Sequence, residues 1–167
     1  MVKVDGYEVP EGLYYSKDFE WIKIEGDKVR MGITDYAQKQ LREIVYAELP
    51  GAGTEVKQNE PYGTVESVKA VSDLIAAISG TVEEVNEEAQ SKPELLNEDP
   101  YVKGWLLVVK PANLQAELPN LMDFDKFAAA LMPSMTRFLA VFSGCAFALA
   151  TRSANVVLPA SNFKALT

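Results

Sequence analysis

The sequence of 167 residues contains no histidine and a single cysteine, Cys145. Without histidine there is no Ser–His or Cys–His nucleophilic pair, no imidazole acid–base catalyst and no histidine metal ligand. One cysteine cannot form an internal disulfide or a zinc knuckle, so the fold is not held together by disulfides. That usage is compatible with a reducing cytosol, and the N-terminus lacks the apolar segment of a signal peptide. We therefore expect a cytoplasmic location.

Basic residues are also few, with 16 Lys and Arg against 24 Asp and Glu, for a net charge of −8. This balance argues against nucleic acid as a partner, because phosphate binding requires clustered cations. All 24 acids lie at or before Asp125, whereas residues 133–167 hold three bases and no acid. We therefore expect a domain over residues 1–132 and an atypical, apolar C-terminal extension over 133–167. Its apolar stretch, 138–150, is short for a membrane span, and we expect the extension to pack poorly on the domain.

Short strand patterns separated by turn residues dominate the first 132 residues. They predict strands at 19–24, 28–33, 44–49, 61–68, 74–78, 81–85 and 105–110. Short helices are predicted at 36–42, from 111 towards 118, and at 123–131 with Asp123 as the cap. Many short strands with regular turns indicate an all-β sandwich or small barrel with helical additions.

One lysine occupies a special place in this pattern. A strand ascends to Val68 and another descends from Val71, so Lys69 and Ala70 are predicted to form a hairpin tip. A lysine at a tip projects its amine into water, where a modifying enzyme can reach it and a long adduct can swing. The alternative interpretation is that Lys69 is one exposed lysine among 12.

The segment Glu66-Ser67-Val68-Lys69-Ala70, followed by Ser72-Asp73 and Ile78-Ser79-Gly80, resembles the lipoyl-attachment hairpin of the glycine cleavage system H protein. Further short matches follow in H-protein order from about Gly12 to Leu131, including Glu20-Trp21, Gly32-Ile33-Thr34-Asp35, Glu48-Leu49-Pro50, Lys92-Pro93 and Gly104-Trp105. The resemblance implies a mainly β fold, the lipoyl/biotinyl-like barrel-sandwich hybrid, with short helical additions.

The resemblance also implies a carrier that is not an enzyme. Lipoic acid would be joined by an amide bond to Lys69 by a lipoylating enzyme. The arm would carry an aminomethyl group from glycine decarboxylase (the P-protein) to the tetrahydrofolate-dependent aminomethyltransferase (the T-protein). Dihydrolipoamide dehydrogenase (the L-protein) would then reoxidise the dithiol. The cofactor supplies the thiol–disulfide chemistry, which suits a chain with no histidine.

Four carboxylates acquire roles from the same resemblance. Glu20, Asp73 and Asp18 match positions that shelter the aminomethyl adduct, where a protonated amine needs carboxylate or hydroxyl partners. Glu66 matches the residue that lipoylating enzymes recognise. The alternative for each is an ordinary solvated acid.

This chain departs from the family at Phe19 and Tyr36, where histidine is common, and this alters the polarity expected of the cleft.

Other interpretations remain open. An H-protein-like carrier in lipoate relay or in sulfur oxidation would keep the arm and change the pathway, and an unlipoylated interaction module would leave Lys69 unmodified. In a biotin carrier, methionines usually flank the modified lysine, whereas the neighbours of Lys69 are Val68 and Ala70. We expect no metal site, because the run of Glu83, Glu84, Glu87 and Glu88 lacks the spacing of a cation cage and indicates a solvated face.

Overall fold

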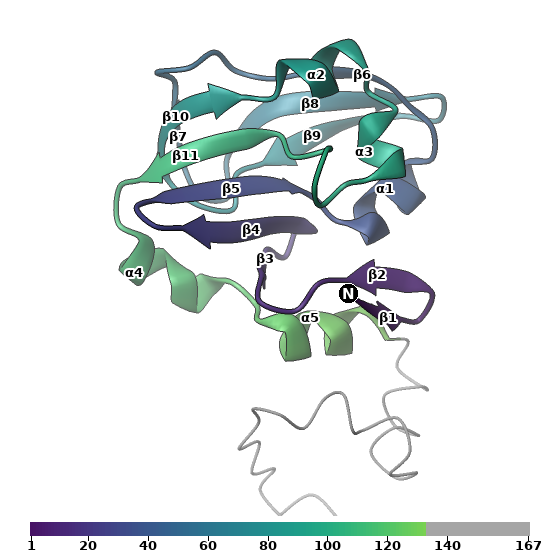
Figure 1. Cartoon of the computed structure of the whole chain (residues 1–167), viewed down its shortest axis with the longest axis horizontal. Helices are drawn as coiled ribbons and strands as arrows, with labels where there is room; N and C mark the ends of the chain where they lie inside the picture. The colour runs from purple at the N-terminus through teal and green to yellow at the C-terminus, as the bar shows by residue number, and fades with distance from the viewer. Residues whose placement is uncertain (133–167) are drawn as a thin grey trace, which may run out of the picture.

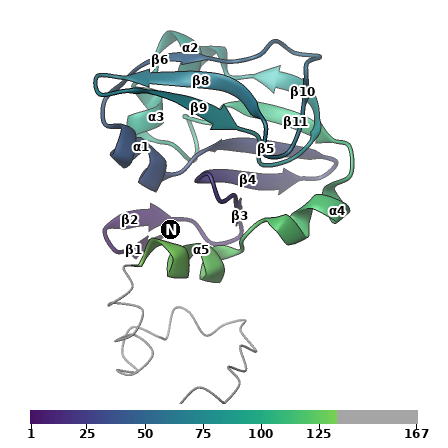
Figure 2. The same cartoon turned by 180° about the vertical axis from the view of Figure 1, so that it is seen from behind.

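The computed structural model of the chain describes residues 1–132, so the predicted extension at 133–167 lies outside the described residues. Two antiparallel sheets face one another (Figures 1 and 2). The larger has the order β3-β4-β5-β11-β10-β7, with β3 Tyr14–Tyr15, β4 Glu20–Glu25, β5 Lys28–Ile33, β11 Leu107–Pro111, β10 Gly80–Val85 and β7 Glu55–Val56. The smaller has the order β6-β8-β9, with β6 Ile44–Glu48, β8 Pro61–Ser67 and β9 Val71–Ile75. The expected fold class, a mainly β barrel-sandwich hybrid with short helices, is confirmed.

The main core lies between these two sheets. Side chains alternate between the two faces of each strand. One buried cluster therefore contains Ile22 and Met31 from the larger sheet together with Val65 and Leu74 from the smaller. Strand β11 is buried along Leu107, Val108 and Val109. Burial of this apolar surface is the main force that holds the sheets together.

A second core lies on the other face of β4, where Trp21 points away from Ile22. It is covered by the hairpin of β1 (Val2–Val4) and β2 (Tyr7–Val9) and by helix α5 (Phe124–Leu131). The Tyr15 and Phe127 rings stack with centroids 4.2 Å apart. Trp21 donates from Nε1 to the backbone oxygen of Pro100 at 3.0 Å. This cluster attaches both ends of the described chain to the sandwich.

The described α-helices are short, and all but one of them are capped at the N-terminus by a side chain. Thr34 caps α1 (Asp35–Leu41) by accepting from the Ala37 N–H. Asp123 caps α5 by accepting from the Lys126 N–H, as the sequence predicted. The other helical segments are α2 Glu87–Ser91, α3 Leu95–Glu98, α4 Leu114–Glu117 and the 3-10 turn η1 Leu118–Asn120. Among residues 1–132, no helix has the length and apolar character needed to cross a membrane.

Three predicted boundaries were wrong by two residues or more. The strand predicted at 105–110 begins only at Leu107. The strand predicted at 74–78 belongs to β9, which begins at Val71 and ends at Ile75. The apolar residues that follow, Ala76 to Ile78, are buried where the chain passes from the smaller sheet to the larger. The helix predicted from Pro111 starts only at Leu114, because the Asn113 side chain caps it by accepting from the Ala116 N–H.

Candidate functional site

Lys69 lies at the tip of the hairpin that joins β8 to β9, at the upper left of Figure 2. The last register pair is Glu66 with Val71, and the Ser67 N–H donates to the Ala70 carbonyl at 2.9 Å. Val68 and Lys69 are therefore the two tip residues, one position earlier than the sequence predicted. Lys69 is exposed, and within residues 1–132 no carboxylate lies within ion-pair distance of its amine.

The backbone of the tip is held in place although the lysine side chain is exposed. The Ser67 hydroxyl accepts from the backbone N–H of Lys69 at 3.2 Å and of Ala70 at 3.1 Å. The Val68 N–H donates to the Glu43 carbonyl at 3.0 Å, which ties the tip to the segment before β6. This role of Ser67 was not predicted from the sequence, although serine side chains are known to hydrogen-bond to backbone N–H groups two or three residues later. The site thus presents an amine from an ordered backbone.

Two of the predicted acids share the outward face of the smaller sheet. Glu66 stands between Tyr46 and Val71 across the three strands, and Asp73 lies opposite Thr64 one row further from the tip. Both carboxylates are exposed. Asp18 is also exposed, in the turn before β4. The structure therefore groups Glu66 and Asp73 near the tip, whereas Asp18 lies close enough to Glu20 to influence its carboxyl group.

Glu20 differs from the other three because its side chain is buried, with 2% of the residue exposed. Both carboxylate oxygens and the Tyr62 hydroxyl lack a hydrogen bond of ordinary geometry. Burial raises the pKa of Glu20 well above its usual value, and Asp18 adds to the rise, while the nearby Tyr62 hydroxyl and Ile75 backbone partly offset it. Burial, with Glu20 beside it, likewise raises the pKa of Tyr62.

Buried polar atoms that lack a hydrogen-bond partner are uncommon in native proteins. Tyr62 and Ile75 stand at the base of the β8–β9 hairpin, so Glu20 lies near its base and Lys69 at its tip. At about 3.3 Å per residue, the strand between them spans roughly 20 Å. The pairing of Glu20 with Tyr62, 42 positions later, has no signal in the sequence.

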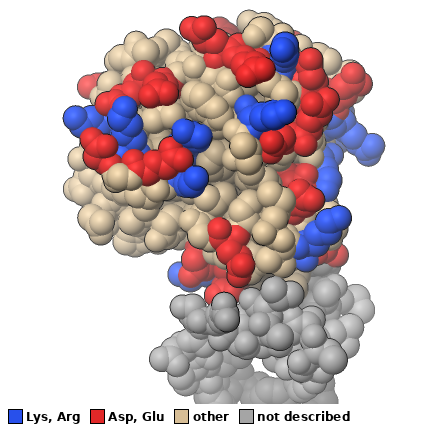
Figure 3. All heavy atoms as spheres, viewed as in Figure 1, with Lys and Arg blue, Asp and Glu red and all other residues tan. Residues whose placement is uncertain are grey.

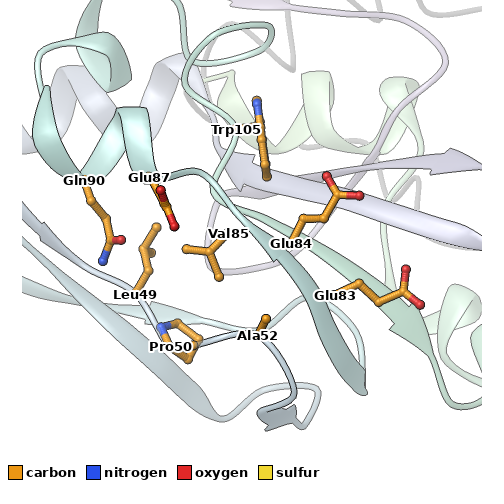
Figure 4. A pocket seen from close by; sticks show the side chains of 10 residues that line it. Leu49, Pro50, Ala52, Glu83, Glu84, Val85, Glu87, Gln90 and Trp105 are labelled. Atoms are coloured by element: carbon orange, nitrogen blue, oxygen red, sulfur yellow. The ribbon is translucent and has the colours of Figure 1, made fainter.

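An open surface pocket of about 500 Å³ lies at the other end of β6 from the tip (Figure 4). It is lined by Leu49, Pro50, Gly51, Ala52, Glu83, Glu84, Val85, Glu87, Gln90 and Trp105. Lys28 pairs with Glu83 at 2.6 Å, and Glu84, Glu87 and Glu88 are exposed, as expected of a solvated face. Acidic and basic side chains are interspersed over this side of the molecule (Figure 3). The described part of the chain brings together no group of three metal-ligating side chains.

Comparison with known proteins gives a consistent result. The family model described as glycine cleavage H-protein matches residues 13–133. A glycine cleavage system H protein from Geobacillus thermodenitrificans is 54% identical over 120 residues, which is 72% of this chain and 94% of that protein. A probable glycine cleavage system H protein from Pyrococcus abyssi is 53% identical over 132 residues, covering 78% of this chain and 98% of that protein.

A solved structure agrees with these relatives. The crystal structure of a glycine cleavage system H protein from Mycobacterium marinum matches with a TM-score of 0.67 and 39% sequence identity. The match covers 73% of this chain and 98% of that one.

Proposed function

The chain belongs to the glycine cleavage H-protein family, and from this premise we propose that it carries lipoic acid on Lys69 and serves as the non-catalytic shuttle of glycine cleavage. The observation that carries the proposal is the exposed Lys69 amine on an ordered hairpin tip. The site fits an amide-linked group, because the amine faces solvent and its backbone is fixed by Ser67. When bound, the lipoyl group supplies a dithiolane that accepts and releases an aminomethyl group.

The chain's own contribution is to present the arm and shelter its cargo. We assign Glu20 as the principal partner of the cargo amine, with Asp73 and Asp18 as further carboxylates. A buried carboxylate without a counter-charge is costly, and a protonated amine beside it would offset that cost. The orphaned Glu20 oxygens support this role, as does the Tyr62 hydroxyl next to them. Glu66, exposed beside the tip, is assigned to recognition by the lipoylating enzyme.

The partners that follow from this role are glycine decarboxylase, the aminomethyltransferase, dihydrolipoamide dehydrogenase and a lipoylating enzyme, in the cytoplasm. The acidic surface favours encounter with basic surroundings of their active sites. The alternative to glycine cleavage is that the same lipoyl arm serves lipoate relay or sulfur oxidation. Support of glycine decarboxylation by a P-protein separates the two.

Intact-protein mass tests the proposal directly. The chain is expressed with a lipoate ligase and lipoic acid, and the modified residue is mapped by peptide fragmentation. We expect one lipoyl increment on Lys69 and none in Lys69→Arg. The matched control, Lys57→Arg in the loop before β8, should keep the increment. An unmodified chain, or an increment on another lysine, would eliminate the carrier function.

A further inference from the structure

The short segment between α1 and β6, residues 42–44, has an unusual backbone. Arg42, which directly follows α1, has φ +72° and ψ −147°. Such angles are nearly confined to glycine, so an arginine keeps them only when its surroundings fix the backbone. Strained backbone of this kind is concentrated at functional sites. The contacts that hold Arg42 in this conformation should therefore show what the strain serves.

The side chain of Asn97 holds the backbone on both sides of Glu43. Its Nδ2 donates to the Arg42 carbonyl at 2.7 Å and to Gln38 Oε1 at 2.9 Å, and its Oδ1 accepts from the Ile44 N–H at 2.9 Å. A carbonyl on one side and an N–H on the other require a donor and an acceptor that point apart. A carboxamide supplies both, whereas a carboxylate supplies acceptors alone.

Asn97 is in turn held by the body of the domain. It lies on α3, which sits beside α1 (Figures 1 and 2). Its neighbour Leu96 is fully buried in the core between the two sheets. Gln38 is also buried, and its Nε2 donates to Asp35 Oδ1 at 2.6 Å, which leaves Gln38 Oε1 facing Asn97. The Asn97 carboxamide therefore links residues 42–44 to a fixed part of the fold.

Two contacts connect residues 42–44 to the tip of the β8–β9 hairpin. The Glu43 carbonyl accepts from the Val68 N–H at 3.0 Å. Ile44 is paired with Ser67 across β6 and β8, and the Ser67 hydroxyl accepts from the next two N–H groups of the tip. Glu43 and Ile44 thus contact the tip, and both belong to the segment that Asn97 holds.

Resting on the proposed function, we infer that Asn97 is the positioning residue for the lipoyl-bearing lysine, because it fixes residues 42–44 and through them the backbone from which Lys69 extends. The hydrogen bonds of Asn97 reach the segment and not the lysine, so it acts through the tip backbone. A tip that is already ordered loses less conformational freedom when a lipoylating enzyme positions the amine. If only a fraction of the tips were ordered, the apparent affinity would fall by that fraction.

Steady-state lipoylation of the full chain by a lipoate ligase, with ATP and lipoic acid, tests the inference. Asn97→Asp keeps an acceptor for the Ile44 N–H but places an oxygen against the Arg42 carbonyl. Asn97→Ala removes all three hydrogen bonds. For both variants we expect the KM for the protein substrate to rise about three- to ten-fold, with kcat within about two-fold, because order in the tip affects binding and not the chemical step.

The matched control is Asn86, whose carboxamide also makes three hydrogen bonds to backbone groups. Its Nδ2 donates to the Lys103 and Trp105 carbonyls at 2.8 and 2.7 Å, and its Oδ1 accepts from the Ala89 N–H at 3.2 Å. These groups belong neither to residues 42–44 nor to the hairpin tip. Asn86→Asp and Asn86→Ala should lower the melting temperature at least as much as the Asn97 variants, because Asn86 is the more buried residue. Their KM should stay within about two-fold of the unaltered chain.

Amide hydrogen exchange gives a second measurement, which does not depend on any variant folding. In the unaltered chain the Val68 N–H should be protected, although 67% of that residue is exposed, because it donates to a carbonyl held in place. In Asn97→Ala the protection of the Val68 and Ile44 N–H groups should fall about ten-fold or more. The Val82 N–H, which donates to the Thr54 carbonyl at 2.8 Å, should keep its protection.

The outcomes separate the two proposals. No lipoylation of the unaltered chain would overturn the proposed function and this inference together. With lipoylation intact, an unprotected Val68 N–H in the unaltered chain would overturn the inference alone. An unchanged KM in folded Asn97 variants, or an equal rise in the Asn86 variants, would also overturn it, since the tip would then be ordered without Asn97 or the effect would be one of general stability.

Discussion

At the scale of single residues, Glu20 shows how far the sequence can lead. Its place in a Glu-Trp match singled it out, but only resemblance separated it from an ordinary surface acid. Its burial against Tyr62 arises when β4 meets the smaller sheet, and no local pattern encodes that contact. The exposure of Lys69 and Glu66 was easier to predict, because it follows from the hairpin itself.

The burial of Glu20 predicts a pH-dependent stability. The folded state has the higher Glu20 pKa, so it binds the proton more tightly than the unfolded chain, whose glutamate pKa is about 4.3. Stability from this group is complete below that value and is lost as the pH rises towards the folded pKa. Glu20→Gln cannot ionise, so between pH 5 and 8 its free energy of unfolding should gain about 1–3 kcal/mol relative to the unaltered chain.

Urea denaturation across that pH range measures the effect. Tyr62→Phe removes a hydroxyl that lowers the Glu20 pKa, so we expect it to extend the loss of stability to higher pH. In the Glu20→Gln background, the same Tyr62→Phe change should no longer alter the pH dependence. Parallel curves for the unaltered chain and Glu20→Gln would contradict a buried, uncompensated carboxyl.

At the scale of secondary structure, the sequence predicted elements whose signals are local. The strands β4 and β5 were predicted from strand patterns separated by turn residues, and α5 from its Asp123 cap. The strands β1 and β2 were missed, since each has three residues. Their hairpin is stabilised by distant contacts, including the Glu8 N–H donating to Asp35 Oδ2 at 2.8 Å. Elements that depend on such contacts carry little local signal.

Glycine at position 63 is required for the pairing of β6 with β8. A Cβ there would lie 2.3 Å from the Glu48 carbonyl oxygen, which is backbone and cannot turn aside. Gly63→Ala should therefore push β6 away and lower the free energy of unfolding by about 1–3 kcal/mol. Gly51→Ala is the matched control, because nothing lies within 4 Å of its Cβ position. Equal denaturation midpoints for the two variants would show that the backbone of β6 does not lie so close to position 63.

At the scale of the whole molecule, composition predicts a division of the chain near residue 132, and the last described helix, α5, packs against the residues that precede it. Helix α5 buries Phe127 and Leu131 against the cluster of Tyr15 and Trp21, so its apolar face is already covered. The sandwich core lies between its own two sheets. The family match, residues 13–133, ends at nearly the same place.

Removal of residues 133–167 should therefore leave the melting temperature within about 3 °C of the full chain, and should leave lipoylation of Lys69 intact. A longer deletion that begins at Asp123 is the informative contrast. It removes α5 and uncovers Tyr15 and Trp21, whose relative exposures are now 0% and 1%. Loss of that apolar burial should lower the melting temperature by roughly 10 °C or more. If the shorter deletion destabilised the chain as much as the longer one, the extension would be part of the fold, and the division of the chain at residue 132 would be wrong.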